Sequence, residues 1–180
     1  MLLPFPVILA PYNTDWPEIA EGYAERLRTL GSVLVEVHHI GSTSVEGLAS
    51  KPIIDLMPVV TDLFNLDKKR DRVEALGYDW HGGLGISGRR YCTLSDEHGK
   101  RIVQVHFFVE DTADVVRHLA FRDYLRAHGE VAHAYEKEKR RARDLHPDDS
   151  YAYGDEKAGW IRQVDAKALI WYGNRKNAAR

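Results

Sequence analysis

The strongest structural signal in the chain lies in two neighbouring stretches of sequence. They are Val35-Glu36-Val37-His38-His39-Ile40-Gly41-Ser42-Thr43-Ser44 and Lys51-Pro52-Ile53-Ile54-Asp55-Leu56-Met57-Pro58-Val59-Val60. The first predicts an apolar strand that ends in a Gly-Ser turn, and the second predicts a strand with a carboxylate near its start. Such a turn lets backbone N–H groups approach an anion closely, and a carboxylate in an apolar strand needs a partner or a metal. Together they predict a phosphate site beside a metal-binding carboxylate.

The segment from His39 to Asp55 also resembles a family signature. An apolar residue, Gly-Ser, a spacer and an acid on the next strand are similar to the opening signature of the nucleotidyltransferase superfamily. The segment resembles still more closely the GrpB family within that superfamily. Later segments that fit are Gly88-Arg89-Arg90-Tyr91, Val105-His106, His118-Leu119-Ala120-Phe121-Arg122-Asp123-Tyr124-Leu125, and Tyr153 with Lys157. The resemblance covers about residues 12–171 and implies a nucleotidyltransferase fold that binds a nucleoside triphosphate with a divalent metal, Mg or Mn.

The composition of the chain argues against several classes of protein. The chain has 180 residues, a net charge of −2 and a pI of about 6.5, so general nucleic-acid binding is not expected. A single cysteine, Cys92, excludes an internal disulfide and favours the cytoplasm. No apolar run is long enough to span a membrane, and residues 2–10 lack the basic start of a signal peptide.

Local patterns predict an α+β fold. Strands are expected at 33–40, 53–60, 90–94 and 102–109, with a short edge strand at 7–10. Helices are expected at 15–30, 61–76, 112–127, 130–145 and 155–172, with a helical turn near 45–48. Strands 33–40, 53–60 and 102–109 should be adjacent in a nucleotidyltransferase-like mixed sheet with flanking helices. We expect residues 1–111 to form this core and residues 112–180 to form a C-terminal helical lobe packed on it.

Asp55 and His106 are the predicted catalytic and metal-binding residues. Because side chains alternate along a strand, Asp55 shares a face with Met57. Most active nucleotidyltransferases have a second acid where Met57 stands, and the resemblance places His106 at the position of the third. Histidine is a poor magnesium ligand, so either the metal is not plain magnesium or His106 acts as a base or hydrogen-bond donor. A hydrogen-bonded core histidine is the structural alternative.

Phosphate and nucleotide contacts are predicted from three parts of the chain. The residues are Gly41, Ser42, Thr43, Ser44, Lys51, Arg90, Tyr153 and Lys157. The Ser and Thr residues offer hydroxyl groups but also suit any turn. Lys51 either reaches a phosphate or ends the loop in solvent. Lys157 extends an apolar helical stripe and either reaches solvent or points into a cleft, and Tyr153, expected just before that helix, could stack on a base.

Three functions remain open at this level. The first is an enzyme that transfers a nucleotidyl group to an unknown acceptor. The second is a nucleotide- or phosphometabolite-binding module without catalysis, which Met57 favours. The third is an adaptor with a protein partner, since some GrpB-like domains are attached to dephospho-CoA kinase. The basic run at 137–143 is expected to be a solvated helix face rather than an RNA site.

Overall fold

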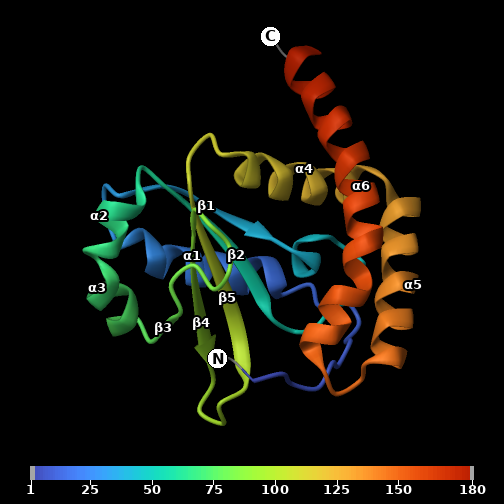
Figure 1. Ribbon diagram of the computed structural model, residues 1–180, viewed down its shortest axis with the longest axis horizontal. Coiled ribbons are helices and arrows are strands. Elements are labelled where there is room, and N and C mark those ends of the chain that lie inside the picture. Colours follow the sequence, from blue (N-terminus) through green and yellow to red (C-terminus); the bar gives the residue numbers. More distant parts are fainter. Residues whose placement is uncertain (1–2, 179–180) are drawn as a thin grey trace.

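The computed structural model describes residues 3–178 and has a five-stranded sheet at its centre (Figure 1). The strands are β1 (Leu34–Ile40), β2 (Ile54–Val60), β3 (Asp79–Trp80), β4 (Arg89–Ser95) and β5 (Arg101–Val109), in the order β1-β2-β5-β4-β3. β2 and β5 are parallel, and the other neighbouring pairs are antiparallel. The sheet is therefore mixed. The predicted α+β class and the adjacency of strands 33–40, 53–60 and 102–109 are confirmed.

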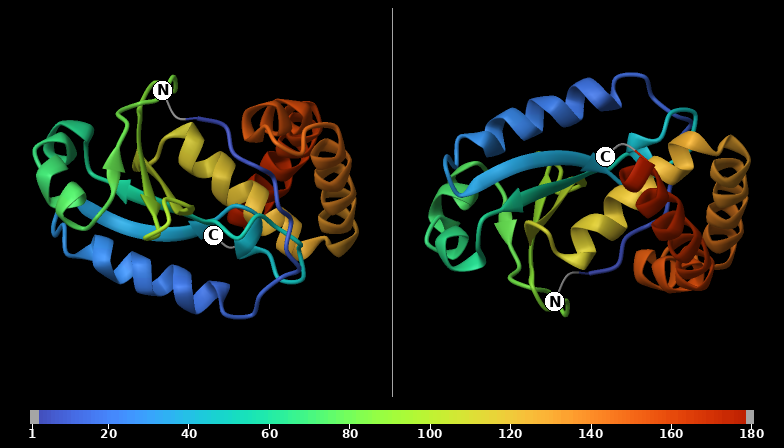
Figure 2. Two further views of the ribbon diagram at one scale, coloured as in Figure 1. Left: turned by 90° about the horizontal axis from the view of Figure 1, so that it is seen from below. Right: turned by 90° about the horizontal axis from the view of Figure 1, so that it is seen from above.

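Helices cover both faces of the sheet (Figure 2). α1 (Trp16–Arg28) lies on one face, and α2 (Leu63–Asp67) and α3 (Arg70–Ala75) contribute to the same core. This larger core joins Leu27 of α1 to Leu56 and Phe107 of the sheet. α4 (Ala113–Ala127) crosses the opposite face, where Val115 packs on Met57. Asp55, two residues before Met57, therefore lies on the α4 face.

The last two helices pack against each other and on the loop after β1. They are α5 (Gly129–Leu145) and α6 (Ser150–Ala178), which run side by side in Figure 1. The rings of Tyr135 on α5 and Trp160 on α6 stack with centroids 4.9 Å apart. Tyr135 also packs with Val45 and Leu48 from the loop after β1. The helices therefore contact the sheet domain directly, and a division between residues 111 and 112 stays a prediction.

Several predicted element boundaries are wrong. The helix expected at 61–76 is two short helices, α2 and α3. The first begins after Asp62, whose carboxylate accepts a hydrogen bond from the Asn65 N–H at 2.7 Å. The strand expected at 7–10 forms a single bridge, from Ala10 to Ser50, and prolines on either side of it lack the N–H that a ladder needs. Residues 45–48, expected as a helical turn, form a single turn closed by a hydrogen bond from the Leu48 N–H to the Val45 carbonyl at 3.2 Å, and a 3₁₀ turn, η1 (Ser42–Ser44), lies just before it.

The last helix begins earlier than predicted, and this changes the place of Tyr153. The Asp149 carboxylate accepts hydrogen bonds from the N–H groups of Tyr151 and Ala152, at 2.9 and 3.0 Å. A carboxylate in this position starts a helix by satisfying its free N–H groups. Tyr153 is thus part of α6, one turn before Lys157 on the same face.

None of the helices within residues 3–178 is long and apolar enough to cross a membrane.

Candidate functional site

A glycine turn at the end of β1 lies directly beside Asp55. Ile40, the last residue of β1, is the register partner of Asp55, and Gly41 follows with φ 70° and ψ −172°. Glycine adopts this backbone conformation readily, whereas other residues do not. A Cβ added to Gly41 would also lie 2.9 Å from the Asp55 Cβ and 3.0 Å from its Cγ. Both the backbone angle and the space therefore require glycine, and the turn brings Ser42 close to the carboxylate.

Asp55 and His106 approach each other from two parallel strands. The register partner of Asp55 is Gln104, and His106 follows it two residues later on the same face. The His106 Nε2 atom lies 3.6 Å from the Asp55 Oδ1 atom. The His106 side chain is 15% exposed, and the Asp55 side chain is 27% exposed. On its other side the His106 ring packs against the Tyr91 ring, with centroids 5.1 Å apart.

A cavity of about 180 Å³ lies between the sheet and helices α5 and α6, and we refer to it as the phosphate-site cavity. Seven residues of the predicted site line it, namely Gly41, Ser42, Thr43, Lys51, Asp55, Tyr153 and Lys157. The other lining residues are Ser50, Ile53, Gln104, Phe121, Tyr135 and Lys139. Asp55 is the only carboxylate among the described residues that line it.

Three lysines from three segments converge on this cavity. Burial and the neighbouring Lys157 lower the pKa of Lys51 to about 8. Burial, with Lys157 as the next cause, lowers the pKa of Lys139 to about 7. Burial also lowers the pKa of Lys157 to about 8, while Asp55 acts in the opposite direction. The lining thus carries three lysines and one carboxylate, Asp55, while Glu136 and Glu138 act on Lys139 and Lys157 from outside the lining, so the cavity favours an anionic ligand.

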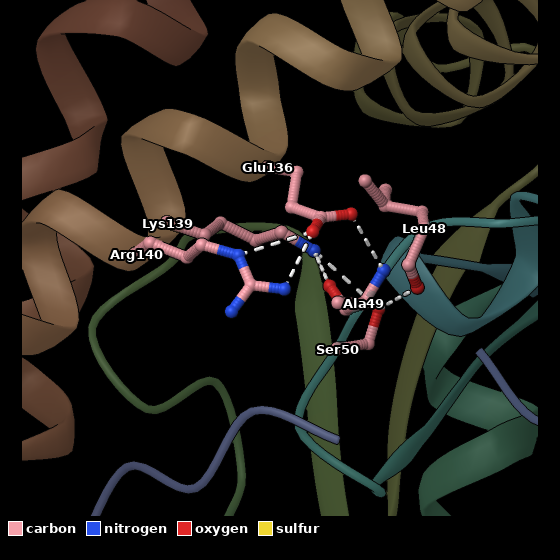
Figure 3. Close-up of polar contacts among 6 residues, drawn as sticks. All are labelled: Leu48, Ala49, Ser50, Glu136, Lys139 and Arg140. Atoms are coloured by element: carbon pink, nitrogen blue, oxygen red, sulfur yellow. Dashed lines mark hydrogen bonds and ion pairs between the residues drawn. The ribbon is translucent and has the colours of Figure 1, made fainter. Parts of the chain in front are cut away.

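Lys139 connects α5 to the loop between η1 and β2 (Figure 3). Its side chain is 1% exposed, and Nζ donates a hydrogen bond to the Ala49 carbonyl and lies 3.4 Å from Ser50 Oγ. Glu136, one turn earlier, accepts a hydrogen bond from the Ala49 N–H at 3.1 Å. α5 therefore holds both polar groups of the Ala49 backbone, and this fixes the loop that leads to Lys51.

Two tyrosines form the aromatic wall of the cavity. Burial raises the pKa of Tyr135 to about 12, while the neighbouring Ser42 side chain acts in the opposite direction. Tyr153 is 2% exposed, and the Nζ atoms of Lys157 and Lys51 lie 4.1 and 5.3 Å from its ring centroid. An aromatic ring stabilises neighbouring cations through its electron-rich face. Tyr153 thus positions the two lysines. Its ring has no exposed face on which a base could stack, contrary to what the sequence had suggested.

Three predicted residues lie outside the cavity. His106 is at its edge, in contact with Asp55. The Ser44 hydroxyl group donates a hydrogen bond to the Gly41 carbonyl at 2.6 Å, so it stabilises the turn. Arg90 is the register partner of Phe107, whose side chain belongs to the core on the opposite face of the sheet. Its guanidinium group forms a two-point ion pair with Asp67 at 2.6 Å, so Arg90 is not part of this site.

Sequence reasoning missed Tyr135 and Lys139. The expected solvated face at 137–143 is wrong for Lys139, which is buried. The signal was present in the spacing, because Ala132, Tyr135, Lys139 and Ala142 recur at steps of three and four residues and are all buried. A lysine within such a stripe indicates a charge directed toward the protein interior.

The residues beside the cavity offer few metal ligands. No group of three or more His, Cys, Asp and Glu side chains that could hold a metal occurs within residues 3–178. Asp55 and His106 supply one carboxylate and one imidazole, and Met57, at the position of a second acid, is fully buried. Magnesium requires about six oxygen ligands, so these side chains do not fit a resident magnesium ion on their own.

The family model described as "GrpB protein" matches residues 6–167. The chain belongs to the GrpB family. The "UPF0157 protein YqkA" of Bacillus subtilis is 37% identical over 168 residues, which are 93% of this chain and 48% of that protein. This GrpB chain thus spans about half the length of that relative. The crystal structure of the conserved protein GrpB from Enterococcus faecalis has a TM-score of 0.85 and 36% identity, and the match covers 92% of this chain and 99% of the other.

Two more distant comparisons add context. A "Dephospho-CoA kinase" of Mycolicibacterium paratuberculosis is 27% identical over 192 residues, which cover 92% of this chain and 47% of that protein. A structure of Cid1 in complex with its short product ApU has a TM-score of 0.46 and 14% identity, covering 69% of this chain and 39% of the other. The Cid1 likeness is too low to carry an argument about activity.

Proposed function

We propose that this GrpB protein binds the phosphate groups of a nucleoside triphosphate in the phosphate-site cavity, together with a divalent metal. The observation that carries the proposal is the convergence of Lys51, Lys139 and Lys157 on one small cavity with a single carboxylate. Buried ammonium groups are unfavourable unless an opposite charge compensates them. A polyphosphate supplies that charge and several hydrogen-bond acceptors.

The size of the cavity favours the phosphate part of such a ligand. Its volume of about 180 Å³ lies below the range of about 300–1,000 Å³ that is usual for pockets holding a whole organic ligand. The lysines, the Ser42 hydroxyl group and the backbone of the Gly41 turn form its polar lining. This set suits phosphate oxygens better than a base or a sugar.

The proposed metal is Mg²⁺ or Mn²⁺, brought with the nucleotide. Asp55 supplies one oxygen ligand from the protein, and the phosphates supply the oxygens that the chain lacks. We assign no ligand role to Met57, and we keep His106 as a base or hydrogen-bond donor beside Asp55.

Nucleotidyl transfer is the reaction that this arrangement would support. An acceptor oxygen forms a bond to the α-phosphorus, the bond from that phosphorus to the bridging oxygen breaks, and pyrophosphate leaves. Lys139 and Lys157 would neutralise the charge that develops on the leaving group. His106 would accept the proton of the acceptor hydroxyl group.

A binding module without catalysis is the second candidate. Met57, 0% exposed on the same face as Asp55, favours it because active nucleotidyltransferases usually carry a second acid there. An adaptor role finds support in the kinase relative, in which the matching region is about half of the protein. In each case we place the protein in the cytoplasm, since its free, buried Cys92 suits a reducing compartment.

Calorimetric titration with ATP, in Mg²⁺ and in a chelator, tests the proposal. We expect tighter binding with Mg²⁺, because metal and nucleotide supply ligands for each other. Asp55→Asn should abolish this difference. In the chelator, Asp55→Asn should bind ATP at least as tightly as the wild type does, since the change removes a negative charge from the cavity.

Asp71→Asn on the exposed side of α3 is the matched control and should behave as the wild type. Equal ATP affinity with and without Mg²⁺ would remove support for metal-dependent binding and favour the binding module. Absence of ATP binding in both conditions would refute the proposal.

A further inference from the structure

A second cavity, of about 480 Å³, adjoins the phosphate-site cavity. It lies between the N-terminal arm, which we define as residues 3–8, and the ends of strands β2, β4 and β5. Lys51 and Ile53 line both cavities, so the two spaces share one wall. A ligand that occupies both cavities has to pass Lys51, whose Nζ atom lies 5.0 Å from the Phe5 ring centroid and 5.3 Å from the Tyr153 ring centroid.

The N-terminal arm is fixed against the helical part of the molecule. The Val7 N–H donates a hydrogen bond to the Pro147 carbonyl at 2.7 Å, and the Phe5 N–H donates one to Ser150 Oγ at 3.3 Å. Beyond the arm, Ala10 and Ser50 exchange both backbone hydrogen bonds at 2.9 Å. In Figure 1 the arm runs past the end of α6 where that helix begins. Its apolar side chains are therefore held in place beside the cavity.

The lining of the second cavity combines an aromatic ring with positive charge. The Lys51 Nζ atom and the Arg101 guanidinium carbon each lie 5.0 Å from the Phe5 ring centroid. The other lining residues are Leu3, Pro4, Pro6, Ile8, Pro52, Ile53, Ser95, Gly99 and Lys100. No acidic residue occurs among the described residues of this lining. Such a surface suits a flat, weakly polar ring that is joined to an anionic group.

We propose that this second cavity holds the base and sugar of the nucleotide whose phosphates occupy the phosphate-site cavity. The inference rests on the proposed function, because it needs the phosphates at the three lysines. The volume of about 480 Å³ lies within the range of about 300–1,000 Å³ that is usual for pockets of organic ligands. Lys51, in the shared wall, then marks the junction between nucleoside and phosphates, and the base lies beside Phe5 and Arg101, which form the aromatic and cationic part of the lining.

The test compares ATP with inorganic tripolyphosphate, which has the phosphates but no nucleoside. Calorimetric titrations in Mg²⁺ should show that Phe5→Ala raises the Kd of ATP about tenfold, in line with the loss of one base–aromatic contact. The Kd of tripolyphosphate should stay within about twofold of the wild-type value. Phe64→Ala, at a 70% exposed phenylalanine on α2, is the matched control and should change neither.

A second variant separates loss of the site from a change in the arm. Ser95→Trp fills the cavity from the sheet side and leaves the arm sequence intact, and it should weaken ATP binding while sparing tripolyphosphate. Equal effects on both ligands, or none on either, in both variants would overturn the inference. If tripolyphosphate fails to bind even the wild type, the proposed function itself fails, and that outcome is distinct from the others.

Discussion

At the level of single residues, the buried Lys139 connects the stability of the protein to pH. The pKa of Lys139 is about 7 in the folded chain, whereas the ordinary value is 10.5. Between these two pH values the unfolded chain binds more protons than the folded chain, so the free energy of unfolding rises with pH. Each unit of difference in pKa corresponds to about 1.4 kcal/mol. The destabilisation by Lys139 is therefore full below pH 7 and declines as the pH rises toward 10.5.

Replacement of Lys139 by methionine tests this linkage. Lys139→Met keeps most of the buried chain but removes the charge, so the increase in stability from pH 7 to pH 9 should be smaller than in the wild type. Urea unfolding followed by circular dichroism at several pH values measures the difference. Lys137→Met, at an exposed position of the same helix, should keep the wild-type slope. Parallel curves for all three proteins would show that Lys139 does not titrate in this range.

Among the structural elements, the turn between β1 and η1 has the strictest requirement for one residue type. Gly41→Ala should destabilise the protein by about 1–3 kcal/mol, because alanine disfavours φ near +70° and its Cβ would press on Asp55. Gly22→Ala is the control. Gly22 lies exposed in α1, and an added Cβ would meet nothing within 4 Å outside its chain neighbours and the backbone of its own helix, so stability should stay equal or rise by up to about 1 kcal/mol. Thermal unfolding measures both, and equal losses would contradict this account of the turn.

Four of the five strands were predictable from sequence, whereas the two-residue strand β3 and the orientation of the helix faces were not. Alternating apolar residues and the Gly-Ser turn define β1 and β2 locally, so the place of Asp55 follows from a few neighbouring residues. Arg90 was misplaced because it and Arg89 point to opposite faces, and the pattern alone does not tell which face carries the site. The many charged residues of α5 predicted a solvent-exposed Lys139, whereas its side chain is buried and hydrogen-bonded to the Ala49 carbonyl.

At the scale of the whole molecule, the cavity wall is assembled from segments that are far apart in sequence. Lys139 contacts Ala49 across 90 residues of sequence. The Phe5 N–H reaches Ser150 across 145. Local periodicity holds no information about such contacts. The sequence therefore predicted the residues that β2 and the turn after β1 contribute to the cavity, but it did not predict those of α5 and the N-terminal arm. Lys157 was the exception: its place at the end of an apolar stripe allowed either solvent or the cleft, and the resemblance to the GrpB family favoured the cleft.

The central claim is that the three lysines of the phosphate-site cavity bind polyphosphate, and one titration tests it most directly. Inorganic tripolyphosphate is titrated calorimetrically into the wild type, Lys157→Met and Lys167→Met, the last being an exposed lysine on the same helix. The account predicts that Lys157→Met raises the Kd at least about tenfold, as expected when a buried charge partner is lost, while Lys167→Met binds as the wild type does. Equal affinity in all three proteins would contradict the claim.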